Sequence, residues 1–141
     1  MRAIRVHEYG GPEAMRLEEV PTPKPGEGQA LVRIEAAGVN FIDVYQRSGL
    51  YKGQLPLPLG LEGAGVVEAV GPGVTSVRVG DRVAWTSVPG SYATHNVVPA
   101  DRLVTLPAGV DSRIGAAAML QGMTAHYLAH STYPSSTATR A

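Results

Sequence analysis

The chain has 141 residues, with 12 basic and 12 acidic side chains and a formal net charge of zero at pH 7. Because these charges form no runs, the composition excludes nucleic acid and anionic membranes as expected partners. No apolar stretch approaches the roughly 18 residues of a membrane span, and no apolar signal region opens the chain, so we expect a cytoplasmic protein of about one domain. The sequence has no cysteine, which excludes disulfides and thiol nucleophiles.

The first half of the chain predicts short strands and one helix. Polar and apolar residues alternate over residues 3–8 and 30–36, which is the period of half-buried strands, and a proline-rich turn at residues 21–26 separates them. A helix is predicted from Asn40 to Ser48 and is ended by Gly49. Asp43 and Arg47 stand four residues apart on this helix, so we expect them to pair.

The second half predicts more strands and then a helical end. Strands are expected at residues 66–70, 82–85, 92–98 and 103–106, with Gly80-Asp81 as a hairpin turn. Asp111 is a predicted N-cap for a helix over residues 112–120, and residues 121–130 form a second helical stretch around Gly122. The sum is a mainly β domain with a few helices.

Residues 60–65 form a glycine-rich segment, and dinucleotide-binding domains use such segments. Gly60, Gly63 and Gly65 come near that pattern, but the residues that follow predict a strand, whereas a cofactor fingerprint opens a helix. We therefore interpret these glycines as positions where the backbone comes close to a neighbour, and we expect no Rossmann fingerprint in this chain.

Several segments resemble the zinc-free NADPH:quinone oxidoreductases of the medium-chain dehydrogenase/reductase family. The most specific is residues 40–51 (NFIDVYQRSGLY), and residues 1–13, 70–74 and 79–83 are also similar. The resemblance implies a GroES-like, partly open β-barrel, the catalytic domain of these enzymes, over residues 1–134. Residues 135–141 do not resemble the family, and we expect the Rossmann domain of these enzymes to be absent from the chain.

The resemblance also implies chemistry without a metal. In zinc-containing members a cysteine falls where Asn40 stands, and a Gly-His-Glu falls where Gly60-Leu61-Glu62 stands. Catalytic zinc takes three ligands from Cys, His and carboxylate side chains, and only Glu62 remains of that set. We expect no zinc, NADPH as the hydride donor, and a small quinone-like molecule as the substrate.

The family pattern assigns site residues on two helical segments. Asn40, Tyr45 and Tyr51 fall at the catalytic cleft, where neutral donors can stabilise charge that develops on the acceptor oxygen. Asn40 also falls near the cofactor, together with Phe41, Thr124 and Tyr127. No residue is assigned to a metal.

Each assignment has a plainer alternative. Asn40 could cap its helix, Tyr45 could pack on Phe41, and Tyr51 could cover apolar surface. Thr124 could hydrogen-bond within its own helix. His126 and His130 share a helix face, but two histidines without a third ligand are a weak zinc signal.

Three functions stay open on the sequence alone: a catalytic domain of a quinone oxidoreductase, a non-enzymatic remnant that cannot hold the dinucleotide, and a co-chaperone-like binding module. The acceptor could be a quinone or a small unsaturated carbonyl compound. Apolar residues at 116–120 and 123–128 would be exposed without a second domain, so self-association through that face is expected.

Overall fold

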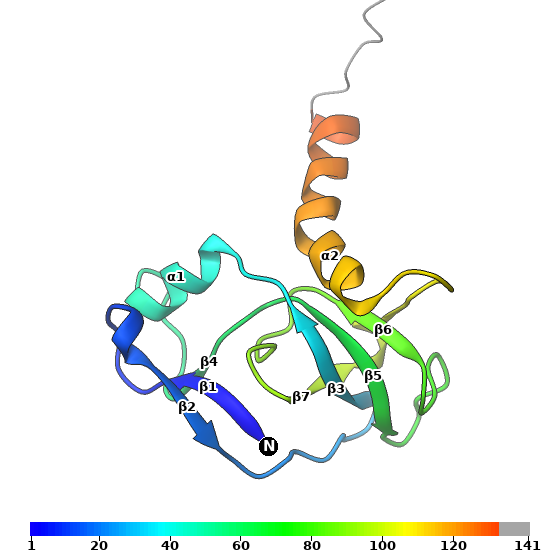
Figure 1. The fold of residues 1–141 in the computed structure, drawn as a ribbon, viewed down its shortest axis with the longest axis horizontal. Coiled ribbons are helices and arrows are strands. Elements are labelled where there is room, and N and C mark those ends of the chain that lie inside the picture. Colours follow the sequence, from blue (N-terminus) through cyan, green and yellow to red (C-terminus); the bar gives the residue numbers. More distant parts are fainter. Residues whose placement is uncertain (133–141) are drawn as a thin grey trace, which may run out of the picture.

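The computed structural model describes residues 1–132, which form two antiparallel sheets and two α-helices (Figure 1). One sheet has the order β2-β1-β4 and the other the order β7-β3-β5-β6-β8. The strands of the first sheet are β1 (Arg2–Val6), β2 (Met15–Glu19) and β4 (Leu57–Pro58). Those of the second are β3 (Gln29–Ala37), β5 (Gly63–Val70), β6 (Arg82–Trp85), β7 (His95–Pro99) and β8 (Val104–Thr105). The helices are α1 (Phe41–Ser48) and α2 (Ser112–Tyr127).

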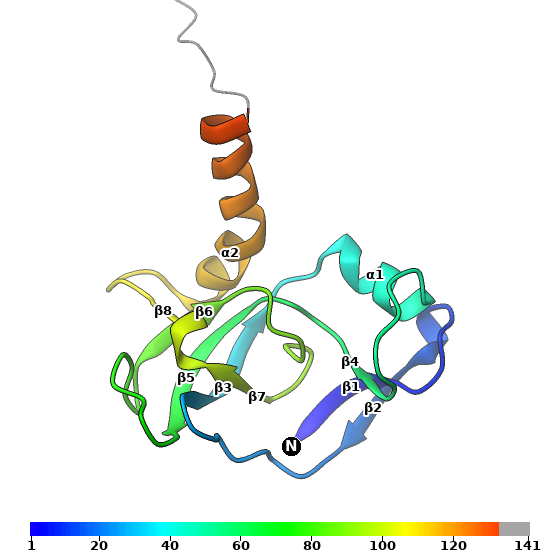
Figure 2. The ribbon, with the colours of Figure 1, turned by 180° about the vertical axis from the view of Figure 1, so that it is seen from behind.

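The two sheets do not close into a full barrel, so the expected mainly β, partly open architecture is confirmed (Figure 2). They are joined where β1 runs beside the segment before β7, through an isolated bridge between Ala3 and Ala93. The Ile4 amide donates to the Tyr92 carbonyl at 2.8 Å in the same place. Single-turn 3₁₀ segments lie at Pro12–Ala14 and Ala100–Arg102.

Each sheet has its own apolar core. The core of the larger sheet surrounds Trp85, which is fully buried, and the smaller sheet packs around Val6 and Leu59. A third cluster joins the base of α2 to the sheet through Ala64, Ala84 and Ala116. Burying side chains of the size of valine or leucine stabilises a fold by about 1.5–3 kcal/mol each.

Two of the glycines at residues 60–65 lie inside strand β5, as the close-approach interpretation predicts. A Cβ atom at Gly65 would lie 2.0 Å from the Arg33 carbonyl oxygen, and one at Gly63 would lie 2.7 Å from the Trp85 ring. Strand β5 begins at Gly63, three residues before the predicted start. The segment is therefore strand and not the start of a helix.

Helix α1 ends at the predicted residue and begins at Phe41, one residue after the predicted start, but it lacks the predicted ion pair. Asn40 is the N-cap residue, and Gly49 ends the helix with φ of 84°. The Asp43 carboxylate is turned inward, where it accepts the Asn40 backbone N–H at 2.8 Å, while Arg47 donates to the Gly10 carbonyl at 3.3 Å. The expected pair between Asp43 and Arg47 is therefore wrong, because the carboxylate caps its own helix.

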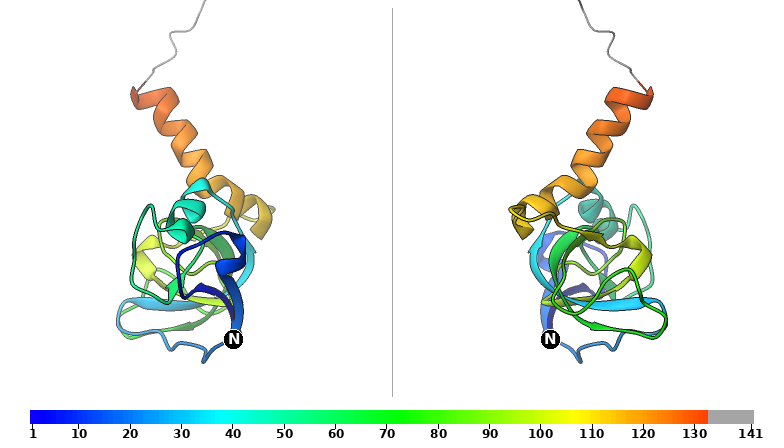
Figure 3. Two further views of the ribbon diagram at one scale, coloured as in Figure 1. Left: turned by 90° about the vertical axis from the view of Figure 1, so that its left-hand side faces the viewer. Right: turned by 90° about the vertical axis from the view of Figure 1, so that its right-hand side faces the viewer.

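Helix α2 is one continuous helix and not two stretches. Its cap is as predicted, since the Asp111 side chain accepts the Ile114 backbone N–H at 2.9 Å. Gly122 interrupts nothing because its neighbours are good helix formers. A short π-helical turn, Leu128–Thr132, follows. The outer half of α2 extends away from the sheets, and the helix bends along its length (Figure 3).

Other expectations differ in detail. Gly80 makes a turn, but the whole segment of residues 71–81 joins β5 to β6, so the turn is not a two-residue hairpin. Strands β2 and β4 were not predicted, while the strand predicted at residues 92–98 begins only at His95. The predicted domain boundary at Pro134 lies outside the described residues. In residues 1–132, no helix combines the length and the apolar character needed to cross a membrane.

Candidate functional site

An aromatic cluster covers one side of α1 and the loop after it. The Tyr45 ring lies between those of Phe41 and Tyr51, with ring centroids 5.7 Å and 5.5 Å apart. Phe41 is 74% exposed and Tyr51 is 54% exposed, so the cluster faces outward. Within residues 1–132 the hydroxyls of Tyr45 and Tyr51 make no hydrogen bond. Three of the predicted site residues are therefore neighbours, and two of them have free phenol donors.

Asn40 stands at the start of α1 and is tied to a buried carboxylate. Its Nδ2 donates to Oε1 of Glu62 at 2.8 Å, and the other oxygen of Glu62 accepts the Leu120 backbone N–H at 2.7 Å. Glu62 is fully buried. One side chain at the entrance of β5 thus holds both the start of α1 and the middle of α2. Local spacing does not reveal either partner, because Asn40 is 22 residues and Leu120 is 58 residues from Glu62 in the chain.

A second buried carboxylate lies on the inner face of α1. Asp43 is 5% exposed, and its Oδ2 accepts the Tyr92 hydroxyl at 2.7 Å in addition to the Asn40 N–H. Burial raises the pKa of Tyr92, and the hydrogen bond to the Asp43 carboxylate raises it further. Tyr92 therefore stays a neutral donor. Sequence reasoning missed this pair because its members are 49 residues apart.

Thr124 and Tyr127 lie on the outer half of α2. Both line a pocket of about 240 Å³ together with Thr86 and Ser87, which follow β6. Ser87 has φ of 63°, a left-handed conformation that is uncommon outside glycine. The Thr124 hydroxyl donates to the Leu120 carbonyl at 2.7 Å, as the plainer alternative predicts, while Tyr127 is 60% exposed.

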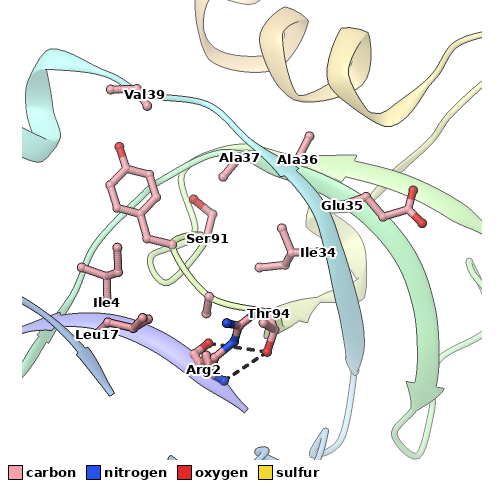
Figure 4. Close-up of a pocket in the computed structure, with 12 residues that line it drawn as sticks. Arg2, Ile4, Leu17, Ile34, Glu35, Ala36, Ala37, Val39, Ser91 and Thr94 are labelled. Atoms are coloured by element: carbon pink, nitrogen blue, oxygen red, sulfur yellow. Dashed lines mark hydrogen bonds between the residues drawn. The ribbon is translucent and has the colours of Figure 1, made fainter. Parts of the chain in front are cut away.

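A larger pocket of about 610 Å³ lies between the two sheets (Figure 4). Ile4 and Leu17 come from the smaller sheet, Ile34 faces them from β3, and Val39 lies at the rim. A second pocket of about 330 Å³ shares Ile4 and Val39 with it and includes Asn40. Phe41, Tyr45 and Tyr51 line neither pocket, so Asn40 is the one predicted residue near α1 that borders this space within residues 1–132.

A chain of charged side chains connects the larger sheet to the start of α2. Glu35 accepts the Ser112 hydroxyl at 2.7 Å and pairs with Arg33 at 3.1 Å. The hydrogen bond from Ser112 lowers the pKa of Glu35, and Arg33 lowers it further against the opposing effect of burial. Arg33 also pairs with Glu68, which in turn contacts His95 at 3.1 Å.

Two of the four histidines stack on each other, and the other two contact glutamates. The His126 and His130 rings stack with centroids 4.2 Å apart, so they share a helix face as predicted. The His130 Nδ1 lies 3.0 Å from the His126 carbonyl oxygen. His7 contacts Glu18. In the part of the chain that the structure describes, no three His, Cys, Asp or Glu side chains come together as a metal site would require.

Comparison with known proteins identifies the family. The model of the alcohol dehydrogenase GroES-like domain matches residues 26–108. The chain belongs to this family. A quinone oxidoreductase of Pseudomonas aeruginosa is 47% identical over 134 residues, and a 2-haloacrylate reductase of a Burkholderia species is 44% identical over 138 residues. These matches cover 94% and 93% of this chain but 41% of each relative.

A solved structure agrees with the sequence relatives. The structure of Escherichia coli quinone oxidoreductase complexed with NADPH superposes with a TM-score of 0.92 at 40% identity, over 95% of this chain and 42% of that one. The expected resemblance to quinone oxidoreductases and the expected GroES-like fold are thus confirmed. The chain spans about 40% of the length of these proteins.

Proposed function

We propose that this GroES-like domain is the acceptor-binding part of an NADPH-dependent quinone oxidoreductase that transfers hydride without a metal. The observation that carries the proposal is the double contact of Glu62, which holds Asn40 from the start of α1 and Leu120 from the middle of α2. The two helices that carry the proposed site residues therefore meet at one carboxylate, which supports a single site shared by both. The quinone oxidoreductase relatives support the reaction class.

The residues of α1 and of the loop after it suit the charge that develops on a quinone oxygen. NADPH, when bound, supplies the hydride, and the reduced acceptor then takes up a proton. Phenol donors beside the acceptor stabilise the negative charge without being ionised themselves. Tyr45 and Tyr51 offer such donors on adjacent rings, and neither hydroxyl is engaged within residues 1–132. We assign them the role of donors to the acceptor oxygen.

The chain fits only the nicotinamide end of the cofactor. A pyrophosphate binds where a helix N-terminus presents free N–H groups. At α1 the Asp43 carboxylate already accepts the Asn40 N–H, and at α2 the Asp111 carboxylate accepts the Ile114 N–H. Both carboxylates would repel a phosphate. The exposed rings of Phe41 and Tyr127 instead suit a flat, uncharged ring, so a second domain must hold the phosphates.

The residues at the expected metal position do not fit zinc. Asn40 turns its amide nitrogen, which has no lone pair for a metal, toward Glu62, so the side chains of Asn40 and Glu62 do not present lone pairs to one shared ion. Leu61 has no ligating atom. Both oxygens of Glu62 already accept hydrogen bonds. We therefore derive no step through a metal.

The exposed face of α2 is suited to contact with a partner domain. Met123, Tyr127 and Leu128 are all exposed along the outer half of the helix, and apolar side chains grouped in this way mark interfaces. We assign this face to the dinucleotide-binding domain. In the 141-residue chain alone, the same face is available for self-association, and turnover is not expected without the second domain.

A comparison with a known protein supports haloacrylates as a second class of acceptor. The relative from Burkholderia is a 2-haloacrylate reductase, and its 44% identity is close to that of the quinone oxidoreductases. Quinones and acrylates share a carbon–carbon double bond conjugated to a carbonyl group. The same donors could therefore stabilise either product, and parallel assays with a quinone and a haloacrylate distinguish the two.

A chimera tests the proposal. Residues 1–134 replace the matched segment of the Pseudomonas aeruginosa quinone oxidoreductase, which supplies the remaining domain. We expect NADPH-dependent quinone reduction, and we expect Tyr45→Phe and Asn40→Ala each to slow hydride transfer at least about tenfold, or about 1.4 kcal/mol. Tyr45→Phe keeps the ring that packs on Phe41 and Tyr51, so it removes the donor alone.

Tyr9→Phe is the matched control, because the Tyr9 hydroxyl bonds only to the backbone of Gly53. Its hydride-transfer rate should equal that of the parent. Melting curves accompany every rate. A folded chimera without reductase activity would overturn the proposed function, and variants that melt and react like the parent would overturn the roles of Asn40 and Tyr45.

A further inference from the structure

We propose that Glu62 is a positioning residue that holds the Asn40 amide in one orientation, with its carbonyl oxygen Oδ1 turned to the ligand as a hydrogen-bond acceptor. This inference rests on the proposed function for its kinetic consequence. It differs from the expectation that Asn40 acts as a donor. The ligand group that it selects is a hydroxyl or an amide N–H at the cleft.

The chemistry of a carboxylate fixes the direction of the hydrogen bond between Asn40 and Glu62. An ionised carboxylate only accepts hydrogen bonds, whereas an asparagine amide has one donating end and one accepting end. Because the Glu62 Oε1 lies 2.8 Å from the Asn40 side chain, the end that faces Glu62 must be the NH₂ group. Oδ1 is therefore on the far side of the amide. Oδ1 has two lone pairs. One can point to the backbone at the first turn of α1, and the other can accept a hydrogen bond from a ligand.

Glu62 is itself held rigidly. The side chain is fully buried, and its Oε2 accepts the Leu120 backbone N–H at 2.7 Å. Gly38 packs so closely that a Cβ atom there would lie 2.1 Å from Oε1. A carboxylate confined in this way cannot rotate to release Asn40. The Asn40 backbone is fixed too, since its N–H donates to Asp43.

Glu62 links α1 to α2. Leu120 lies one turn before Thr124 on α2, and Asn40 begins the helix that carries Phe41 and Tyr45. A side chain that joins both helices sets the position of Asn40 relative to the proposed cofactor residues. A shift at Glu62 would thus change ligand binding without any direct contact between Glu62 and the ligand.

Nuclear magnetic resonance of the 141-residue chain tests the contact itself. The chain has two asparagines, Asn40 and Asn96, so their side-chain NH₂ signals are readily told apart with Asn40→Ala. We expect slow hydrogen exchange at the Asn40 NH₂ group and its loss in Glu62→Gln. Glu68→Gln is the control, since Glu68 pairs with Arg33 and His95 and does not contact Asn40. An Asn40 signal that is unaffected by Glu62→Gln overturns the inference, whatever the chimera does.

A reciprocal pair of variants tests the role of Oδ1 in the chimera. Asn40→Asp sets two carboxylates against each other, and Glu62→Gln leaves too few acceptors, so each should lower kcat/KM about tenfold. The double variant, which combines Asn40→Asp with Glu62→Gln, keeps one negative charge in the pair and reverses the direction of the hydrogen bond. The new amide at position 62 donates to the new carboxylate at position 40, and an acceptor still faces the ligand.

The double variant should therefore recover kcat/KM to within about threefold of the parent. A double variant that folds with the reversed hydrogen bond but stays about tenfold slow shows that Asn40 works as a donor, and this overturns the inference. Melting curves separate loss of folding from loss of positioning. If the parental chimera is inactive, the proposed function fails, while the resonance experiment still decides whether Glu62 holds Asn40.

Discussion

The hydrogen bond between Tyr92 and Asp43 gives a direct measure of how α1 is held on the β domain. Tyr92→Phe removes one hydroxyl and keeps the ring. In the parent, the Oδ2 atom of Asp43 accepts both the Tyr92 hydroxyl at 2.7 Å and the Asn40 N–H at 2.8 Å, while Oδ1 has no hydrogen-bond partner within residues 1–132. The variant would leave a carboxylate that is 5% exposed with a single donor.

The expected cost follows from these contacts. A hydrogen bond to a charged group contributes about 1.5–3 kcal/mol, and we take about 2 kcal/mol because the ring of Tyr92 is only partly buried. A folded unit of about 130 residues unfolds with an entropy of about 0.28 kcal/mol per kelvin. The melting temperature should therefore fall by about 7 °C.

The pH dependence gives a second test of the same bond. The pKa of Tyr92 is raised in the folded state, so the folded protein keeps this proton more tightly than the unfolded chain does. The stabilisation is thus fully present below the unfolded pKa of about 10 and is lost as the pH rises toward the folded pKa. The gap in stability between the parent and Tyr92→Phe should narrow above about pH 10.

Thermal melts followed by circular dichroism at about pH 7 and about pH 10.5 measure both effects. Tyr127→Phe is the matched control, because the Tyr127 side chain is 60% exposed and its hydroxyl makes no hydrogen bond within residues 1–132. It should melt like the parent. A Tyr92→Phe variant that melts within about 1 °C of the parent at neutral pH would refute the reasoning.

Three further predictions follow from the site. The purified chain should retain less than one zinc per molecule after washing with a chelator, because Asn40 and Leu61 cannot replace the ligands of zinc; mass spectrometry that finds one zinc per chain contradicts this. The 141-residue chain should give no saturable isotherm with micromolar NADPH in calorimetry, since carboxylates occupy the N-termini of α1 and α2. Ser112→Ala should raise the pKa of Glu35 and lower the melting temperature at neutral pH by a few degrees, about 1 kcal/mol for a partly exposed bond. Because the folded-state pKa of Glu35 is lowered, this stabilisation is present above the unfolded value of 4.5 and is lost as the pH falls through the folded value, so parent and variant should converge in acid.

The sequence predicts those elements whose signals are local. The N-cap at Asn40 and the left-handed Gly49 give the limits of α1, and Asp111 gives the start of α2. The prediction of two helical stretches at Gly122 was wrong, because a single glycine costs only about 1 kcal/mol in a helix and does not end it. Strand β2 was missed because most of its residues are exposed and it is held by pairing with β1.

The contacts that build the site depend on distant parts of the chain. Asp43 and Arg47 have the spacing of an ion pair, but the fold brings Tyr92 to Asp43 from 49 residues away, and the carboxylate turns inward to meet it. Glu62 likewise meets Leu120 from 58 residues away. Local spacing shows which groups could interact on one helix. It does not show which of them the packing of two sheets and a second helix will bury.

The contact between Asn40 and Glu62 explains how this site can keep its shape without a metal. In zinc-containing members that the sequence resembles, a cysteine stands at the position of Asn40. A zinc ion lies about 2 Å from each of its nitrogen and oxygen ligands, so two ligand atoms on one zinc stay more than about 3 Å apart. Here Nδ2 and Oε1 are 2.8 Å apart and bond directly. The amide thus closes the space between the two side chains, and the start of α1 is held to β5 by a hydrogen bond alone.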